Sequence, residues 1–158
     1  MLRKFYKALV WTMLIGMVVF TGPLAAQETA GTEENYDPDL KYAQVRKVVM
    51  EENADGSWDF SVTVRHADSG WDHYADLWQV VAEPGGEVLD ERPLAHPHTS
   101  EQPFTRSLSR VTIPSSVETV RVRARCNRHG FDGQQVVIPL DENPDTDEGE
   151  NYTIRRRN

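Results

Sequence analysis

Apolar and polar residues alternate with a period of two along the middle of the chain. Two segments show this most clearly, GSWDFSVTVRH (residues 56–66) and VETVRVRARC (residues 117–126), in which nearly every second residue is apolar. Such alternation is the pattern of a β-strand that buries one face and exposes the other to solvent. No part of this region has the 3.6-residue period of an amphipathic helix. The pattern therefore predicts an all-β domain.

Five further strands are predicted, at residues 44–51, 76–82, 87–94, 104–113 and 134–140. In the strand over residues 104–113 the alternation changes phase, because Phe104 and Leu108 cannot share a face with Val111. A bulge near Ser109-Arg110 would reconcile the two halves. About seven short strands over residues 42–141 predict an antiparallel β-sandwich.

The two ends of the chain are expected to lie outside this domain. Residues 1–26 have the basic start, apolar centre and small-residue end of a secretory signal peptide. Residues 27–41 are predicted to form an acidic disordered linker and residues 142–158 a disordered tail, because neither segment has enough large apolar residues to offset its ordering entropy. After signal cleavage the protein is expected to be periplasmic or secreted, in a bacterium.

The chain carries 17 Lys and Arg against 25 Asp and Glu, which gives a formal net charge of −8 at pH 7. An acidic chain is repelled by phosphate backbones and anionic lipids, so binding to nucleic acid is not expected, nor is membrane insertion after signal cleavage. The single cysteine, Cys126, excludes an internal disulfide, and the domain must be stabilised by its hydrophobic core. Cys126 itself is predicted to be a buried thiol, with pairing between two chains as the alternative.

All five histidines are predicted to lie at one end of the sandwich. If each strand runs antiparallel to the one before it, the connections alternate between two ends, and those near residues 67–75, 95–103 and 127–133 share one of them. This end, the histidine pole, would contain His66, His73, His96, His98 and His129. Their gathering at one end makes a shared site a testable hypothesis.

The sequence His96-Pro97-His98 has a local geometry that suits chelation. A residue before proline adopts an extended conformation, so the two imidazoles project to roughly the same side. Such a pair can bind zinc or copper together with ligands from other loops. The candidate metal ligands are His73, His96, His98 and His129, with Asp72 as the carboxylate neighbour. The alternative is that Pro97 stiffens the loop while the imidazoles bond to nearby backbone. His66 continues the buried register of its strand and is expected to be a histidine at the edge of the core.

Other chemistry has less support in the sequence. Cys126 and His129 have the Cys-x-x-His spacing of a blue-copper loop, but Asp132 stands where a methionine ligand would be expected, and the inward register of Cys126 indicates the core. The chain has no Gly-x-Ser-x-Gly elbow, no phosphate-binding glycine loop and no His-Glu-x-x-His motif. No catalytic residue is assigned, and an enzymatic function is the least expected.

Two resemblances add to this picture. Trp78 and the segment VRVRARCNRHGFDG (residues 120–133) resemble the core tryptophan and the sixth strand with its loop in immunoglobulin-like and fibronectin type III domains, which implies the same sandwich architecture. The combination of WDHYAD (71–76), HPHTSEQPFTRSL (96–108) and HGFDG (129–133) resembles an uncharacterised family of short exported bacterial proteins. This second resemblance implies a single-domain exported protein and carries over no activity.

The sequence therefore predicts an exported recognition or accessory module whose partner is an extracytoplasmic protein or a small ligand. The alternative function is that of a transition-metal protein, with zinc or copper held by histidines of the histidine pole.

Overall fold

The computed structural model of the protein describes residues 40–141 and 147–157. The chain divides into two units, residues 1–36 and 37–158, and all described residues belong to the second. The predicted signal peptide (1–26) and nearly all of the predicted linker (27–41) lie outside the described residues. No described segment forms a helix with the length and hydrophobicity needed to cross a membrane.

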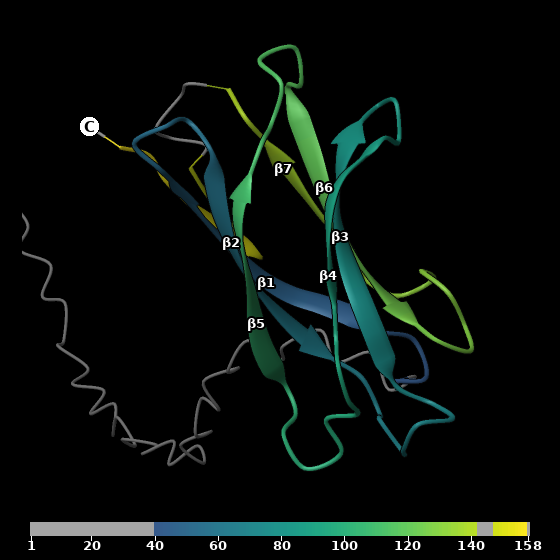
Figure 1. Ribbon diagram of the computed structural model, residues 1–158. Helices are drawn as coiled ribbons and strands as arrows, with labels where there is room; N and C mark the ends of the chain where they lie inside the picture. The colour runs from purple at the N-terminus through teal and green to yellow at the C-terminus, as the bar shows by residue number, and fades with distance from the viewer. Residues whose placement is uncertain (1–39, 142–146, 158) are drawn as a thin grey trace, which may run out of the picture. The chain divides into compact units, whose positions relative to one another are not determined.

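The described residues form nine strands and no helix (Figure 1). The strands are β1 (Gln44–Glu52), β2 (Trp58–Arg65), β3 (Ala75–Glu83), β4 (Val88–Pro93), β5 (Phe104–Val111), β6 (Thr119–Cys126), β7 (Val136–Pro139), β8 (Glu148–Gly149) and β9 (Tyr152–Arg155). They build a five-stranded sheet in the order β5-β2-β1-β9-β8 and a four-stranded sheet in the order β4-β3-β6-β7. All pairs are antiparallel except β1 with β9. The prediction of an all-β sandwich is confirmed.

The core lies between the inner faces of the two sheets. Strand β2 buries every second residue, and β6 does the same in the facing sheet. Trp78 on β3, Val62 on β2 and Val122 on β6 are fully buried. Each large apolar side chain buried in this way stabilises the fold by about 1.5–3 kcal/mol. The core thus provides the stability that the chain cannot obtain from disulfides.

The predicted bulge is present where β5 pairs with β2. Trp58 pairs with Val111 and Phe60 with Leu108, so two residues of β5 oppose the single residue between Trp58 and Phe60. Arg110 has a φ of 62°, and its N–H donates to Asp59 Oδ1 at 2.8 Å. The bulge lets both halves of β5 turn their apolar residues toward the core.

The C-terminal segment differs from the expected disordered tail. Residues 142–146 and 158 lie outside the described residues, but β8 and β9 add to the five-stranded sheet beyond β1. Ile154 on β9 is buried, with 5% of its surface exposed. The physical reason is that Tyr152, Thr153 and Ile154 form a short β-prone run, and β1 offers an edge with which it can pair. The acidic composition of the preceding residues concealed this strand.

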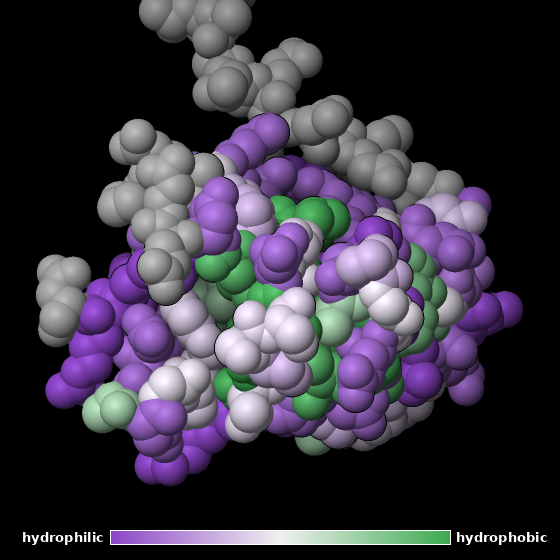
Figure 2. Space-filling model, turned by 90° about the horizontal axis from the view of Figure 1, so that it is seen from above, coloured by the Kyte–Doolittle hydropathy of each residue, from purple (hydrophilic) through white to green (hydrophobic). Residues whose placement is uncertain are grey.

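The connections alternate between the two ends of the sandwich. The loops after β2, β4 and β6 lie together at the lower end of Figure 1, and these loops carry all five histidines. Figure 2 shows the opposite end, where hydrophobic residues are visible between hydrophilic ones. The fold therefore brings every histidine to the histidine pole, and the directions of the side chains decide which of them meet.

Candidate metal centre

His66 is the first histidine beyond β2, and it keeps the inward direction of the strand. Its side chain is fully buried. The backbone N–H of His66 is held in place because it donates to Gln102 Oε1 at 3.1 Å. The next residue, Ala67, donates its N–H to Leu40 O at 2.9 Å. These bonds fix the backbone of His66 at the end of the core.

His73 lies in the loop that leads into β3, and this loop is held against the end of β6. The His73 N–H donates to Gly70 O at 3.1 Å, which closes a tight turn. Asn127 accepts from Tyr74 N–H at 3.1 Å through Oδ1 and donates to Trp71 O at 3.0 Å through Nδ2. The backbones of Asn127 and Tyr74 are also joined, at 3.1 Å. This clamp sets the position of the His73 ring over the end of β6.

Cys126 and His129 belong to a single tight turn after β6. Cys126 is the last inward residue of the strand and is fully buried. Its carbonyl accepts from His129 N–H at 3.2 Å and from Gly130 N–H at 2.9 Å. Gly130 has a φ of +69°, a conformation that favours glycine, and it reverses the chain. The turn brings His129 Nδ1 to 3.4 Å from Cys126 Sγ.

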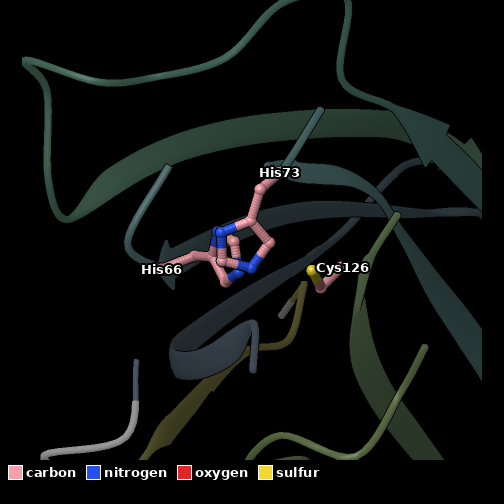
Figure 3. A group of neighbouring side chains, drawn as sticks. All are labelled: His66, His73 and Cys126. Carbon is pink, nitrogen blue, oxygen red and sulfur yellow. The ribbon is translucent and has the colours of Figure 1, made fainter. Parts of the chain in front are cut away.

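The four side chains meet at the histidine pole. Each of His66, His73 and Cys126 offers a ligand atom within 4.8 Å of those of the other two. Figure 3 shows these three side chains pointing toward one another from three separate segments. The ring centroid of His73 lies 4.7 Å from that of His66 and 5.0 Å from that of His129. His129 therefore extends the group to three imidazoles and one thiol.

Three imidazole nitrogens of this group converge on one backbone oxygen. The Lys41 carbonyl oxygen lies 2.9 Å from His66 Nε2, 3.4 Å from His73 Nε2 and 3.1 Å from His129 Nδ1. A carbonyl oxygen has two lone pairs, so three N–H donors cannot all be well satisfied there. The three nitrogens are thus arranged around a common point, the Lys41 oxygen.

Asp68 orients His66 from the opposite side of the ring. The His66 Nδ1–H donates to Asp68 Oδ1 at 2.6 Å, and the carboxylate also accepts from Ala75 N–H at 3.0 Å and from His98 N–H at 2.6 Å. Burial alone would raise the pKa of the Asp68 carboxyl, but these hydrogen bonds together hold it below its usual value. The bond to Asp68 thus orients the ring so that His66 Nε2 faces the Lys41 oxygen, 2.9 Å away. An imidazole nitrogen in this position can bind a metal through its lone pair.

The environment also favours the neutral form of His73. Its pKa is lowered by partial burial and then by the neighbouring His66, while the contact with the Lys41 carbonyl acts in the opposite direction. A neutral imidazole is the form that binds a metal. The lowered pKa therefore favours the form of His73 that can bind a metal at neutral pH.

The ligand set and its spacing suit a transition metal. With metal bonds of about 2.1 Å to nitrogen and 2.3 Å to sulfur, the nitrogen–sulfur edge of a tetrahedral site is about 3.6 Å. The separation of 3.4 Å between His129 Nδ1 and Cys126 Sγ is close to this edge. Imidazole and thiolate ligands suit zinc, copper and iron and not magnesium or calcium. A carboxylate that hydrogen-bonds to a ligating histidine, as Asp68 does here, is a common feature of such sites.

The structure separates the candidate ligands predicted from the sequence. His73 and His129 lie in the group just described. Among the described residues, the group whose ligand atoms all lie within 4.8 Å of one another is His66, His73 and Cys126. His129 adjoins this group through Cys126 and the His73 ring, whereas His96, His98 and Asp72 lie outside it. His96 and Asp72 are exposed. His98 is buried and stacks on Phe104, with ring centroids 3.7 Å apart, and its ring nitrogens have no hydrogen-bond partner among the described residues.

Sequence reasoning missed His66 and Cys126 as candidate ligands. The inward register of these two residues predicts that they belong to the core, and both are buried. The Cys-x-x-His spacing of Cys126 and His129 was the available signal. The missing methionine argues against a blue-copper site alone, and the spacing serves other metal sites equally well.

Comparison with known proteins gives one relative and one weak structural likeness. No family model matches the chain. A protein of Halomicrobium mukohataei named "Putative lipoprotein" is 35% identical over 127 residues, which cover 80% of this chain and 59% of that protein. The chain thus spans about 59% of the length of this relative. The superoxide reductase (1Fe-SOR) from Giardia intestinalis aligns with 61% of this chain and 99% of its own, with 15% identity and a TM-score of 0.39. At that TM-score the likeness carries no argument. The fold and the site define the protein as a β-sandwich with a histidine and cysteine cluster at one end.

Proposed function

We propose that this protein is an exported β-sandwich that binds a transition metal, zinc or copper, at His66, His73, Cys126 and His129. The observation that carries the proposal is the convergence of three imidazole nitrogens and one thiol from three separate segments. In the alternative, a metal-free recognition module, the same residues would serve only to hold the loops together.

Export is supported by two independent observations. Residues 1–26 have the pattern of a secretory signal peptide. The relative from Halomicrobium mukohataei is named as a lipoprotein, a class of exported proteins. We infer that this chain acts outside the cytoplasm as an accessory protein whose ligand is a metal ion.

Titration calorimetry with Zn²⁺ on the tag-free protein tests the proposal. We expect one-to-one binding that weakens at least about 100-fold in a His73→Ala variant, because the site loses one of its ligands. His96→Ala is the matched control, since His96 is an exposed histidine of the same pole outside the group. This control should bind as the wild type does. Thermal unfolding without metal shows whether each variant is folded.

Cobalt provides a second measurement that identifies the thiol. A Co²⁺-loaded protein with a Cys126 thiolate ligand has a sulfur-to-cobalt charge-transfer band in the near ultraviolet, and Cys126→Ala should abolish it. Absence of binding to the wild type would refute the proposal. Binding that survives His73→Ala but is lost in His96→Ala would refute this site and favour the His96-Pro97-His98 chelate instead.

A further inference from the structure

We propose that the main-chain carbonyl of Lys41 is itself a ligand of this metal centre, so that metal binding fastens the segment before β1 to the histidine pole. This inference rests on the proposed function, because it adds a neutral oxygen ligand to the same site. It also assigns a role to a main-chain carbonyl, which no sequence motif for metal binding would identify.

The first argument is the position of the oxygen. It lies between 2.9 and 3.4 Å from nitrogens of three different histidines. A metal bonded to all three nitrogens at about 2.1 Å must lie close to the axis through their centre, and the oxygen, at similar distances from the three nitrogens, lies near that axis as well. In the plane of the nitrogens the metal would be about 2.3 Å from the oxygen, which is within bonding range. A metal in that position would bind this oxygen without moving it.

The second argument is that the backbone around Lys41 is fixed on both sides. The carbonyl of Leu40 accepts from Ala67 N–H at 2.9 Å, next to the ligand His66. The Tyr42 ring packs edge-on against His129, with centroids 5.7 Å apart. Ala43 is fully buried, and its carbonyl lies so close to Gly133 that a Cβ there would be 1.9 Å away. Moving the Lys41 oxygen away would break several of these contacts, whereas binding the metal keeps them.

The third argument concerns hydrogen bonding and charge. When the three nitrogens bind a metal through their lone pairs, they cease to donate to the Lys41 oxygen. If the Lys41 oxygen binds the same metal, the metal replaces the lost donors and the oxygen does not have to move. One thiolate against a divalent ion leaves a charge of about +1, and the Asp68 carboxylate beside His66 balances it. As a fifth ligand beside the three imidazoles and the thiolate, a neutral carbonyl adds no further charge.

Trypsin tests the role of this oxygen directly, because it cleaves after lysine and arginine. It attacks the carbonyl carbon of the bond that it cuts and must place the oxygen of that carbonyl in its oxyanion hole. A Lys41 carbonyl that is bound to metal cannot do so. Cleavage of the Lys41–Tyr42 bond is therefore measured by mass spectrometry on the full chain with Zn²⁺ and with a chelator. Cleavage after Arg110, which lies at the opposite end with 79% of its side chain exposed, is the internal reference.

We expect the ratio of cleavage at Lys41 to cleavage at Arg110 to fall at least about tenfold on zinc loading. The ratio removes any effect of zinc on trypsin and any general gain in stability. In the His73→Ala variant zinc should leave the ratio unchanged. A ratio that stays constant or rises in the zinc-bound wild type would overturn the inference. Calorimetry on the same sample separates the two proposals, since absence of zinc binding overturns both, and binding without protection overturns this one alone.

An NMR measurement distinguishes coordination from simple rigidity. Lys-Tyr occurs once in the chain, so labelling lysine with ¹³C at the carbonyl and tyrosine with ¹⁵N gives one correlation, from the Lys41–Tyr42 peptide. We expect its carbonyl shift to move on zinc loading and to show coupling to ¹¹³Cd when cadmium replaces zinc. An unchanged carbonyl shift in the metal-bound protein would also overturn the inference.

Discussion

Replacement of Asp68 by asparagine tests the design of the histidine pole, because this buried carboxylate holds three separate segments. It accepts from the His66 ring, from Ala75 N–H and from His98 N–H. Asparagine has one acceptor oxygen and one NH₂ group. If the asparagine oxygen takes the Oδ1 position, its NH₂ group faces His98 N–H. In the other orientation, the NH₂ group faces the two donors His66 Nδ1–H and Ala75 N–H. At least one buried donor is left unsatisfied in either case.

The expected loss follows from these bonds. One unsatisfied buried donor costs about 1–3 kcal/mol, and loss of the charge weakens the remaining bonds further. We expect Asp68→Asn to lower the free energy of unfolding by about 2–4 kcal/mol, which corresponds to a drop in Tm of about 8–20 °C for a domain of this size. Zinc affinity should fall about 10–100-fold, because His66 loses the partner that orients its ring. Denaturant unfolding and calorimetry measure the two effects.

The pH dependence of this difference has a defined sign. The pKa of Asp68 in the folded protein lies below the ordinary value of 3.8, so its contribution to stability is fully present above about pH 4 and is lost as the pH falls through the lower folded value. The gap between wild type and Asp68→Asn should therefore be constant near neutral pH and narrow in acid. The exposed Asp72→Asn is the matched control and should change neither stability nor zinc affinity. An Asp68→Asn protein within about 0.5 kcal/mol of the wild type would refute the reasoning.

Two further predictions concern the backbone and the last strand. Gly133→Ala should lower stability by about 1–3 kcal/mol and weaken zinc binding, because the added Cβ would lie 1.9 Å from Ala43 O and push the segment that carries Lys41. Gly85→Ala, which meets nothing within 4 Å, should have little effect on Tm, and equal values for the two variants would contradict the close approach. Ile154→Asp should lower the free energy of unfolding by several kcal/mol, because it buries a carboxylate on β9. Arg155→Ala, at the exposed next position, should be mild in the same urea titration, and the same small effect for both would show that β9 does not dock.

The sequence was sufficient to predict the sandwich because its alternation is regular and its turns are well marked. Even the bulge in β5 followed from a change of phase between Phe104 and Val111. The strand β9 could not be predicted in the same way, since it has four residues and only Ile154 is buried. A strand this short has no period of its own, and pairing with the edge of β1 decides its conformation.

The place of the candidate site was predictable from the sequence, but of its members only His73 and His129 were predicted. Which end a loop belongs to depends only on the order of antiparallel strands, so all five histidines could be assigned to one pole. Which imidazoles meet depends on turn geometry that leaves little trace in the sequence. The Asn127 clamp on the loop of His73 is an example, because it joins residues more than fifty positions apart. His96 and His98 have the clearer local motif, yet a motif fixes the geometry of one loop alone.

The inward register of a residue at the end of a strand is evidence for a ligand as much as for a core residue. In a sandwich, the last inward positions of strands in facing sheets approach each other where the core ends. His66 occupies this position beyond β2, and Cys126 occupies it on β6 in the other sheet. An apolar pair there would simply close the core. A histidine and a cysteine instead place two metal-binding atoms at the one point where buried side chains from both sheets meet the loops. His73 and His129, being only partly buried on those loops, then complete the group from the solvent side.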